Sequence, residues 1–244
     1  MSEEKRKYRV EVCFSPDEFD LYKQEYKVVV AIDVLRATTA ICTAFEHGAE
    51  KIIPVSTVEE AREYKDKGYI AGAERNGQIV DGFDFGNSPY SYMSEAIKGQ
   101  TLVLTTTNGT RAINIAAATH KVIIGALVNL DAVIAFLIDQ PDDVLLLASG
   151  WQGKFNLEDS ICAGAITEAL LQSGKYMSDE DSTIASMFLF KEARVNYFGF
   201  LKASSHRRRL RNLNLNEDIK YCLTPNQTRV IPVYKDGALV KMEL

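Results

Sequence analysis

Residues 28–32, Val-Val-Val-Ala-Ile, form a continuous apolar run that leads into the polar turn Asp33-Val-Leu-Arg36 and then into an apolar helical pattern ending near Glu46. A short apolar run followed by a helix is typical of a parallel strand buried on both faces. Residues 102–104 and 144–148 are two further runs of this kind. The sequence therefore predicts an α/β fold with a mainly parallel or mixed sheet, flanked by helices in three layers.

The units that begin with the first two runs resemble each other. In both, a strand, a polar turn containing Arg-Ala and a helix lead to another apolar run, at residues 51–53 and 121–124. The similarity fits either a duplicated βαβ unit or ordinary α/β patterning. Near the C-terminus, residues 228–240 predict a hairpin that turns at Asp236-Gly237. No stretch has the composition of a flexible linker, so we expect one domain over residues 1–244.

Composition excludes several classes of protein. Of the 244 residues, 46% are hydrophobic and 25% charged, which is typical of a globular chain and not of a disordered or fibrous one. The net charge, 28 − 33 = −5, provides no broad basic field for nucleic acid or an acidic membrane. The four cysteines are far apart in sequence and form no CxxC pair, which argues against a zinc ribbon or a disulfide framework. The charged start, MSEEKRKYRV, has no apolar segment of a signal peptide, so we expect a cytoplasmic protein.

Polar turns follow the predicted strands, where ligands of open α/β sheets bind. Residues 105–111, Thr-Thr-Thr-Asn-Gly-Thr-Arg, combine hydroxyls, an amide, a glycine and an arginine in front of a helix. Free backbone N–H groups and the helix dipole make such a turn a cradle for an anion. The same residue types also cap helices, so a purely structural role stays open.

Carboxylates accompany the other turns. Asp33 and Arg36 could be a metal ligand beside a phosphate clamp, or they could form a local salt bridge. Glu158 and Asp159 could bind Mg²⁺, or they could stabilise the start of a helix. Glu74 lies in a stretch rich in glycine and polar residues, 71–77, which together with residues 82–89 we expect to be a functional loop. Hard oxygen ligands of this kind favour Mg²⁺.

Familiar catalytic motifs are absent from the sequence. It contains no GxGxxG, no GxxxxGK[ST], no GxSxG and no DxDx[TV]. Residues 204–211 are a basic run that we interpret as a solvated helix face, within which His206 is the one plausible acid or ligand contact.

Several motifs together resemble the ComB family of 2-phosphosulfolactate phosphatases. They occur in the family's order and extend over roughly residues 28–171. They are Asp33-Val-Leu-Arg-Ala-Thr-Thr39, Gly72-Ala-Glu74-Arg75, Gly82-Phe-Asp84-Phe-Gly-Asn87-Ser88-Pro89, Thr106-Thr-Asn-Gly-Thr-Arg111 and Glu158-Asp159. The resemblance implies a Mg²⁺-dependent phosphatase with an α/β fold that converts (R)-2-phospho-3-sulfolactate to sulfolactate and phosphate, a step toward coenzyme M.

The resemblance also suggests roles for individual residues. We hypothesise that Asp33 with Glu158 or Asp159 holds Mg²⁺, and that Glu74 or Asp84 helps or activates water. The phosphoryl group would be held by Arg36, Thr106, Thr107, Asn108, Gly109, Thr110 and Arg111. The carboxylate and sulfonate would be held by Arg75, Asn87, Ser88 and His206.

Two alternatives stay open. The first is the same chemistry on another 2-phospho-hydroxy acid, and the second is a non-catalytic module that binds anions. In either case the expected partner is a small anionic phosphorylated acid and not a nucleic acid or a membrane. A homo-oligomer is expected only on general grounds, because most oligomers of soluble proteins consist of identical chains.

Overall fold

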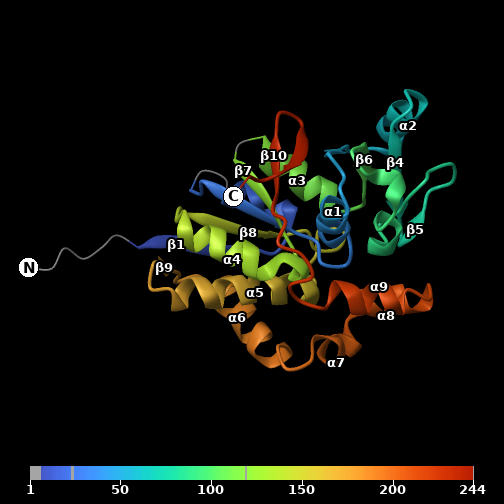
Figure 1. The fold of residues 1–244 in the computed structure, drawn as a ribbon. Helices are drawn as coiled ribbons and strands as arrows, with labels where there is room; N and C mark the ends of the chain where they lie inside the picture. The colour runs from blue at the N-terminus through green and yellow to red at the C-terminus, as the bar shows by residue number, and fades with distance from the viewer. Residues whose placement is uncertain (1–6, 23–24, 119, 244) are drawn as a thin grey trace, which may run out of the picture.

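The computed structural model describes residues 7–22, 25–118 and 120–243. A twisted sheet lies between two layers of helices, with α1 and α3 on one side and α4, α5 and α6 on the other (Figure 1). The predicted three-layer α/β fold is confirmed. None of the helices in the described part of the chain has the length and apolar character needed to cross a membrane.

The elements have the following bounds. The strands are β1 (Tyr8–Cys13), β2 (Val28–Ile32), β3 (Lys51–Pro54), β4 (Ile70–Arg75), β5 (Gln78–Ile79), β6 (Thr101–Thr105), β7 (Lys121–Gly125), β8 (Val144–Ala148), β9 (Tyr176–Met177), β10 (Pro232–Lys235) and β11 (Ala238–Lys241). The α-helices are α1 (Ala37–Glu46), α2 (Val58–Asp66), α3 (Gly109–Ala117), α4 (Leu130–Asp139), α5 (Leu157–Gln172), α6 (Asp181–Ala193), α7 (Tyr197–Phe200), α8 (Ser205–Asn212) and α9 (Asn216–Cys222).

The sheet consists of two parallel groups joined by a hairpin. Its strand order is β5-β4-β6-β3-β11-β10-β7-β2-β8-β1-β9. Strands β4, β6 and β3 are parallel to one another, as are β7, β2, β8, β1 and β9. Between the groups, β10 pairs antiparallel with β7, and β11 pairs antiparallel with β3. The sheet is therefore mixed, as the sequence allowed.

The two similar units exchange their strands. Helix α1 connects β2 to β3, but β3 pairs with β6, whereas α3 connects β6 to β7, and β7 pairs with β2. Each unit thus contributes one strand to each half of the sheet. The two connecting helices consequently lie against each other. This crossing brings the polar turns after β2 and β6 to one place.

The C-terminal hairpin is confirmed at the predicted turn. Strands β10 and β11 pair antiparallel from Pro232 with Lys241 to Lys235 with Ala238. Asp236 and Gly237 have φ angles of 50° and 83°. Two central residues with positive φ are what a type I′ turn requires, and Asp-Gly supplies them at low cost.

The expected loop over residues 71–77 is wrong. Strand β4 extends through residue 75 and pairs parallel with β6, and an Asn76-Gly77 turn leads into β5. Ala71, Gly72 and Ala73 are buried in this strand. Small residues fit where side chains from both helix layers crowd the sheet. Because they show no apolar periodicity in the sequence, the strand was not recognised.

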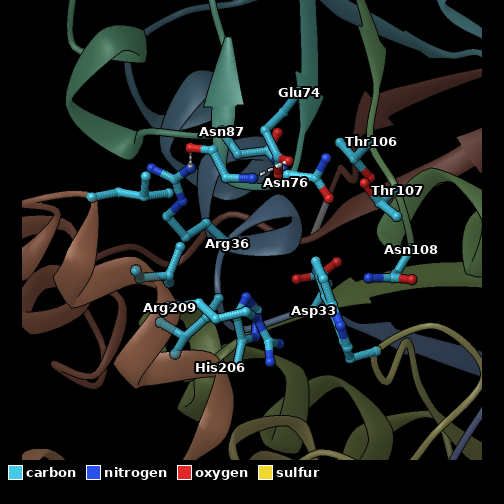
Figure 2. Close-up of a pocket in the computed structure, with 15 residues that line it drawn as sticks. Asp33, Arg36, Glu74, Asn76, Asn87, Thr106, Thr107, Asn108, His206 and Arg209 are labelled. Atoms are coloured by element: carbon cyan, nitrogen blue, oxygen red, sulfur yellow. Dashed lines mark hydrogen bonds between the residues drawn. The ribbon is translucent and has the colours of Figure 1, made fainter.

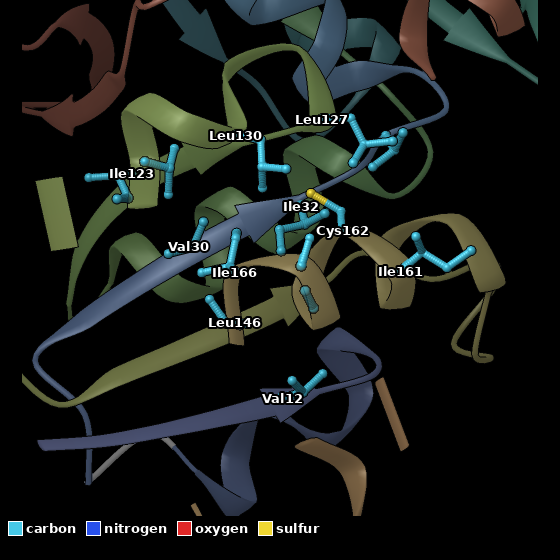
Figure 3. Packing of buried hydrophobic residues seen from close by; sticks show 14 of the residues in the cluster. Val12, Val30, Ile32, Ile123, Leu127, Leu130, Leu146, Ile161, Cys162 and Ile166 are labelled. Atoms are coloured by element: carbon cyan, nitrogen blue, oxygen red, sulfur yellow. The ribbon is translucent and has the colours of Figure 1, made fainter. Parts of the chain in front are cut away.

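Burial on both faces explains the uninterrupted apolar runs. Val30 and Ile32 of β2 pack with Ile166 of α5 on one face, as Figure 3 shows for that cluster. Val29 and Ala31, which alternate with them, belong to the cluster that contains α1 and α3 on the other face. Because successive side chains of a strand point to opposite faces, a strand covered on both sides is apolar at every position.

The chain after β9 returns across the end of the sheet. Helix α6 packs against α5, and α7, α8 and α9 follow in succession. Helix α9 contacts the 3₁₀ turn Pro89–Tyr92, which follows β5 in the chain. This arrangement places α8 beside the turns that follow β2 and β6 (Figure 1).

Candidate active site

A small cleft opens where the turns after β2 and β6 meet α8 (Figure 2). It is lined by Asp33, Leu35, Arg36, Glu74, Asn76, Gly77, Asn87, Thr106, Thr107, Asn108, Trp151, His206, Arg209, Leu210 and Leu213. Of the residues predicted for the site, the cleft brings together Asp33, Arg36, Glu74, Asn87, Thr106, Thr107, Asn108 and His206. These residues lie up to 173 positions apart in the sequence, so only the fold could assemble them.

The first turns of α1 and α3 meet at Gly109. A Cβ atom at this position would lie 2.5 Å from the Cβ of Ala37 and 2.8 Å from Asp33 Oδ2. Both distances are too short for real atoms, so a side chain at position 109 would displace the Asp33 carboxylate. The glycine is therefore required for close approach of the two helices.

Thr106 and Thr110 close the first turn of α3. Each residue's backbone N–H donates to the other's hydroxyl at 3.1 Å. Among the described residues, no acceptor is given a hydrogen bond from the backbone N–H groups of residues 107–109. Unsatisfied amides at a helix start attract an anion. The expected cradle is thus available in this turn.

Asp33 is the buried carboxylate at the end of β2. Its Oδ1 accepts a hydrogen bond from the Ala37 backbone at 3.3 Å. Burial raises the pKa of Asp33 to about 6, while His206 lowers the pKa and Glu74 and Glu158 raise it. A raised carboxylate pKa in a cleft is typical of functional sites.

Glu74 and Asn87 form the opposite wall. Glu74 Oε1 accepts from the Gly77 backbone at 2.6 Å, and Oε2 accepts from Asn87 Nδ2 at 2.9 Å. The other amide atom, Asn87 Oδ1, is buried and has no hydrogen-bond partner among the described residues. An unpaired buried oxygen is costly, so Asn87 Oδ1 is available to accept a hydrogen bond or to contact a cation.

His206 enters the cleft from α8 and is oriented by Glu158. The Nδ1 atom of His206 lies 2.6 Å from Glu158 Oε1, and both side chains are buried. The imidazole also packs against the Trp151 ring, with centroids 5.2 Å apart. A carboxylate behind one ring nitrogen fixes the orientation of the ring, which leaves the other nitrogen available for proton transfer.

Asp159 supports the turn after β2 from behind. Its Oδ1 accepts from the Val34 backbone at 2.8 Å, and its Oδ2 accepts from Gly150 N and from Asn156 Nδ2. Burial, followed by the charges of Asp33 and Glu158, raises its pKa well above the ordinary value. These contacts occupy both oxygens of Asp159, which does not line the cleft.

Arg36 lines the cleft but its charge is already paired. Arg36 Nη1 lies 2.5 Å from Asp218 Oδ2, and both side chains are buried. Arg36 Nη2 also donates to the Gly77 carbonyl at 3.1 Å. Arg36 therefore forms a salt bridge, but not the local one that the sequence allowed, because Asp218 lies 182 residues away on α9. The paired guanidinium is also not a free clamp for phosphate.

Several predicted site residues lie outside the cleft. Asp84 binds Lys65 at 2.6 Å on the surface, and Ser88 precedes a 3₁₀ turn. Arg75 donates to Thr105 Oγ1 and to a backbone carbonyl, and Arg111 forms an exposed ion pair with Asp17. Gly109 and Thr110 do not line the cleft, although Gly109 lies against Asp33 and Ala37.

The interpretation of residues 204–211 as a solvated helix face is wrong for one side of α8. Arg208 and Arg211 are exposed, but His206 and Leu210 are buried, and Arg209 lines the cleft. The helical spacing places positions 206, 209 and 210 on one face. Sequence reasoning missed Arg209, because a basic run gives no sign of which arginine faces inward. It also missed Trp151, Asn76 and the leucines that line the cleft.

The oxygen donors of the cleft fit Mg²⁺. Asp33, Glu74 and the unpaired Asn87 Oδ1 are hard ligands, and Mg²⁺ takes one or two carboxylates together with water and phosphate oxygens. Among residues 7–22, 25–118 and 120–243, no three His, Cys, Asp or Glu side chains form a metal-holding group. The hypothesised set of Asp33, Glu158 and Asp159 does not form such a group. Glu158 contacts His206, and both oxygens of Asp159 accept hydrogen bonds.

The cleft lies at the carboxyl ends of β2, β4 and β6, which is where α/β proteins bind their ligands. A family model described as 2-phosphosulpholactate phosphatase matches residues 13–237. A probable 2-phosphosulfolactate phosphatase of Caldanaerobacter subterraneus subsp. tengcongensis is 44% identical over 216 residues, covering 86% of this chain and 89% of the relative. Proteins of the same name from Clostridium beijerinckii and Clostridium acetobutylicum are each 35% identical over 95% of this chain, covering 98% and 100% of the relatives.

The chain belongs to the 2-phosphosulpholactate phosphatase family. It is accordingly a phosphoric monoester hydrolase. The resemblance drawn from the sequence motifs is confirmed.

Proposed function

We propose that this chain hydrolyses (R)-2-phospho-3-sulfolactate to sulfolactate and phosphate, with Mg²⁺ as cofactor and water as the attacking group. The names of the relatives support the substrate. The observation that carries the reaction is the cleft itself, which Asp33 and Glu74 line together with the α3 turn and His206. Phosphoryl transfer requires such positioning and charge neutralisation more than covalent chemistry.

Charge balance supports the need for a cation. Asp33 and Glu74 line the cleft, and Glu158 and Asp159 lie behind it, whereas Arg209 is the one lining arginine of the described residues that is not paired with an acid, because Arg36 is paired with Asp218. A substrate with a phosphate, a carboxylate and a sulfonate would be repelled by this group of acids. Mg²⁺ held by Asp33 and Glu74, next to Asn87 Oδ1, would supply the missing positive charge and orient water.

The chain's own residues then divide the remaining work. The amides of residues 107–109 bind the phosphoryl oxygens, and Thr106 holds their turn in shape through Thr110. His206, oriented by Glu158, gives a proton to the oxygen that leaves with sulfolactate. Leu210 and Leu213 exclude water from the α8 side of the cleft.

The test is phosphate release from racemic 2-phosphosulfolactate, assayed with Mg²⁺ and with EDTA. We expect release that requires the metal and stops near half of the material, because one enantiomer is used. Racemic 2-phospholactate and 2-phosphoglycolate are assayed beside it. Equal or higher kcat/KM on these compounds would contradict the substrate, and full release in EDTA would contradict the metal. No release from any of them by folded protein would leave only anion binding.

A further inference from the structure

Arg209 lines the cleft and has no ion-pair partner among the described residues. Its Nε and Nη2 atoms are buried and have no hydrogen-bond partner among the described residues. The third nitrogen, Nη1, reaches only Ser205 Oγ, at 3.5 Å. Burial without an anion costs free energy, so this guanidinium is arranged for a ligand that the protein does not itself provide.

The guanidinium is also held in place. Its Cζ lies 4.2 Å from the centre of the Trp151 ring, over whose face it is stacked. Stacking on an aromatic ring fixes the plane of the fork, which can then bind two oxygens of one anion. Of the two arginines lining the cleft in the described part of the chain, Arg36 is committed to Asp218, so Arg209 is the one available to substrate.

Position along α8 indicates which part of the substrate it meets. Arg209 follows His206 by three residues, and both side chains face the cleft (Figure 2). In the proposed substrate, the leaving oxygen is on C2 and the sulfonate is on the neighbouring C3. A histidine that protonates the leaving oxygen therefore places an adjacent group of the substrate near Arg209.

The carboxylate and the sulfonate, which are both attached next to C2, differ in how well they bind a metal ion. A carboxylate is a good ligand for Mg²⁺, which places it on the side of Asp33 and Glu74. A sulfonate is a poor metal ligand and a very weak base, so it can lie beside His206 without taking its proton. From these observations, and resting on the proposed function, we propose that Arg209, stacked on Trp151, binds the sulfonate and determines selectivity for sulfonated phosphate esters.

The experiment compares three phosphate esters. They are 2-phosphosulfolactate, 2-phospholactate, which lacks the sulfonate, and the phosphate ester of isethionate, which lacks the carboxylate. We expect Arg209→Met to lower kcat/KM about a hundredfold on both sulfonated esters, as loss of a charge-assisted bidentate contact predicts. The loss on 2-phospholactate should be much smaller, so the selectivity ratio collapses. Arg209→Lys, which keeps the charge without the fork, should lie between.

The other outcomes each overturn the proposal. An equal loss on all three esters assigns Arg209 to the phosphoryl group, and a loss on only the two carboxylated esters assigns it to the carboxylate. No loss on any ester makes it structural. Arg211→Met is the matched control, since Arg211 lies on the same helix but is exposed and outside the cleft; it should leave all three values unchanged.

Binding gives a readout that does not require turnover. Trp151 is the single tryptophan of the chain, so its fluorescence reports on the Arg209 site directly. Sulfolactate added in EDTA should change this fluorescence more strongly than lactate, and Arg209→Met should abolish the difference. If wild type binds sulfolactate in this way but hydrolyses no sulfonated ester, the proposed function fails while the assignment of Arg209 stands. If wild type hydrolyses the ester but sulfolactate binding is unaffected by Arg209→Met, only the assignment fails.

Discussion

Replacing Asp33 by asparagine should stabilise the protein at neutral pH while it abolishes turnover. Asparagine has the same shape and keeps an acceptor for the Ala37 backbone N–H. What it removes is a negative charge that burial disfavours, which is why the pKa of Asp33 is raised from 3.8 to about 6. A group whose pKa is raised by folding contributes its full stability below the unfolded pKa and loses it as pH rises through the folded pKa.

The size of the effect follows from the two pKa values. Ionising Asp33 in the folded protein costs about 3 kcal/mol at pH 8, since each pKa unit corresponds to about 1.4 kcal/mol. At pH 5 the carboxyl is mostly protonated in the folded state, and the cost is about 1.6 kcal/mol. The stability gained by Asp33→Asn should therefore be about 1.4 kcal/mol larger at pH 8 than at pH 5.

Urea unfolding of both proteins at pH 5 and pH 8 measures this difference. EDTA is present, because bound Mg²⁺ would stabilise the ionised carboxylate. Asp66→Asn, which removes an exposed carboxylate at the end of α2, controls for loss of one surface charge. A stability difference that does not grow with pH, or a variant less stable than wild type at pH 8, would refute the reasoning. Near-normal turnover by the Asp33→Asn variant would show that the Asp33 carboxylate is not needed for catalysis.

Three further predictions concern the surroundings of Asp33. Asp218→Ala should destabilise the protein by about 3–5 kcal/mol in urea unfolding, because it leaves the buried Arg36 charge unpaired; a loss below about 1 kcal/mol would mean that water already screens the pair. Gly109→Ala should cost about 1–3 kcal/mol and most of kcat, since its methyl group overlaps the Asp33 carboxylate, and wild-type kinetics would show that the two helices separate easily. His206→Asn should lower kcat by about 10²–10⁴-fold, and an effect confined to KM would assign His206 to binding instead.

Much of the fold follows from local patterns of the sequence. Strands β2 and β8 begin and end at the bounds that their apolar runs predicted, because burial on both faces leaves no polar position within them. The Asp236-Gly237 turn was equally predictable, since it depends only on the φ angles of two residues. Strand β4 was missed because Ala71, Gly72 and Ala73 are selected for small size, which leaves no periodic signal.

The sequence predicted which types of residue form the site better than it predicted which individual residues line the cleft. Asp33, Glu74 and the Thr106 turn were found because polar residues at strand ends are conspicuous beside apolar strands. Asp84 and Arg111 have the same appearance in the sequence, yet both form ion pairs outside the cleft. Charge alone therefore identified candidates without separating those that face inward from those that face water.

The sequence by itself determined the class of fold, the membership of the family and the turn chemistry, because each depends on residues close together in the chain. Only the tertiary structure decided that β2 and β6 deliver their turns to one cleft, since this follows from exchanged strand pairing. It also decided that Arg36 is neutralised by Asp218 and that Arg209 has no ion-pair partner within the described part of the chain. The partner of a long charged side chain depends on which distant element packs beside it, and that is fixed only when the whole chain has folded.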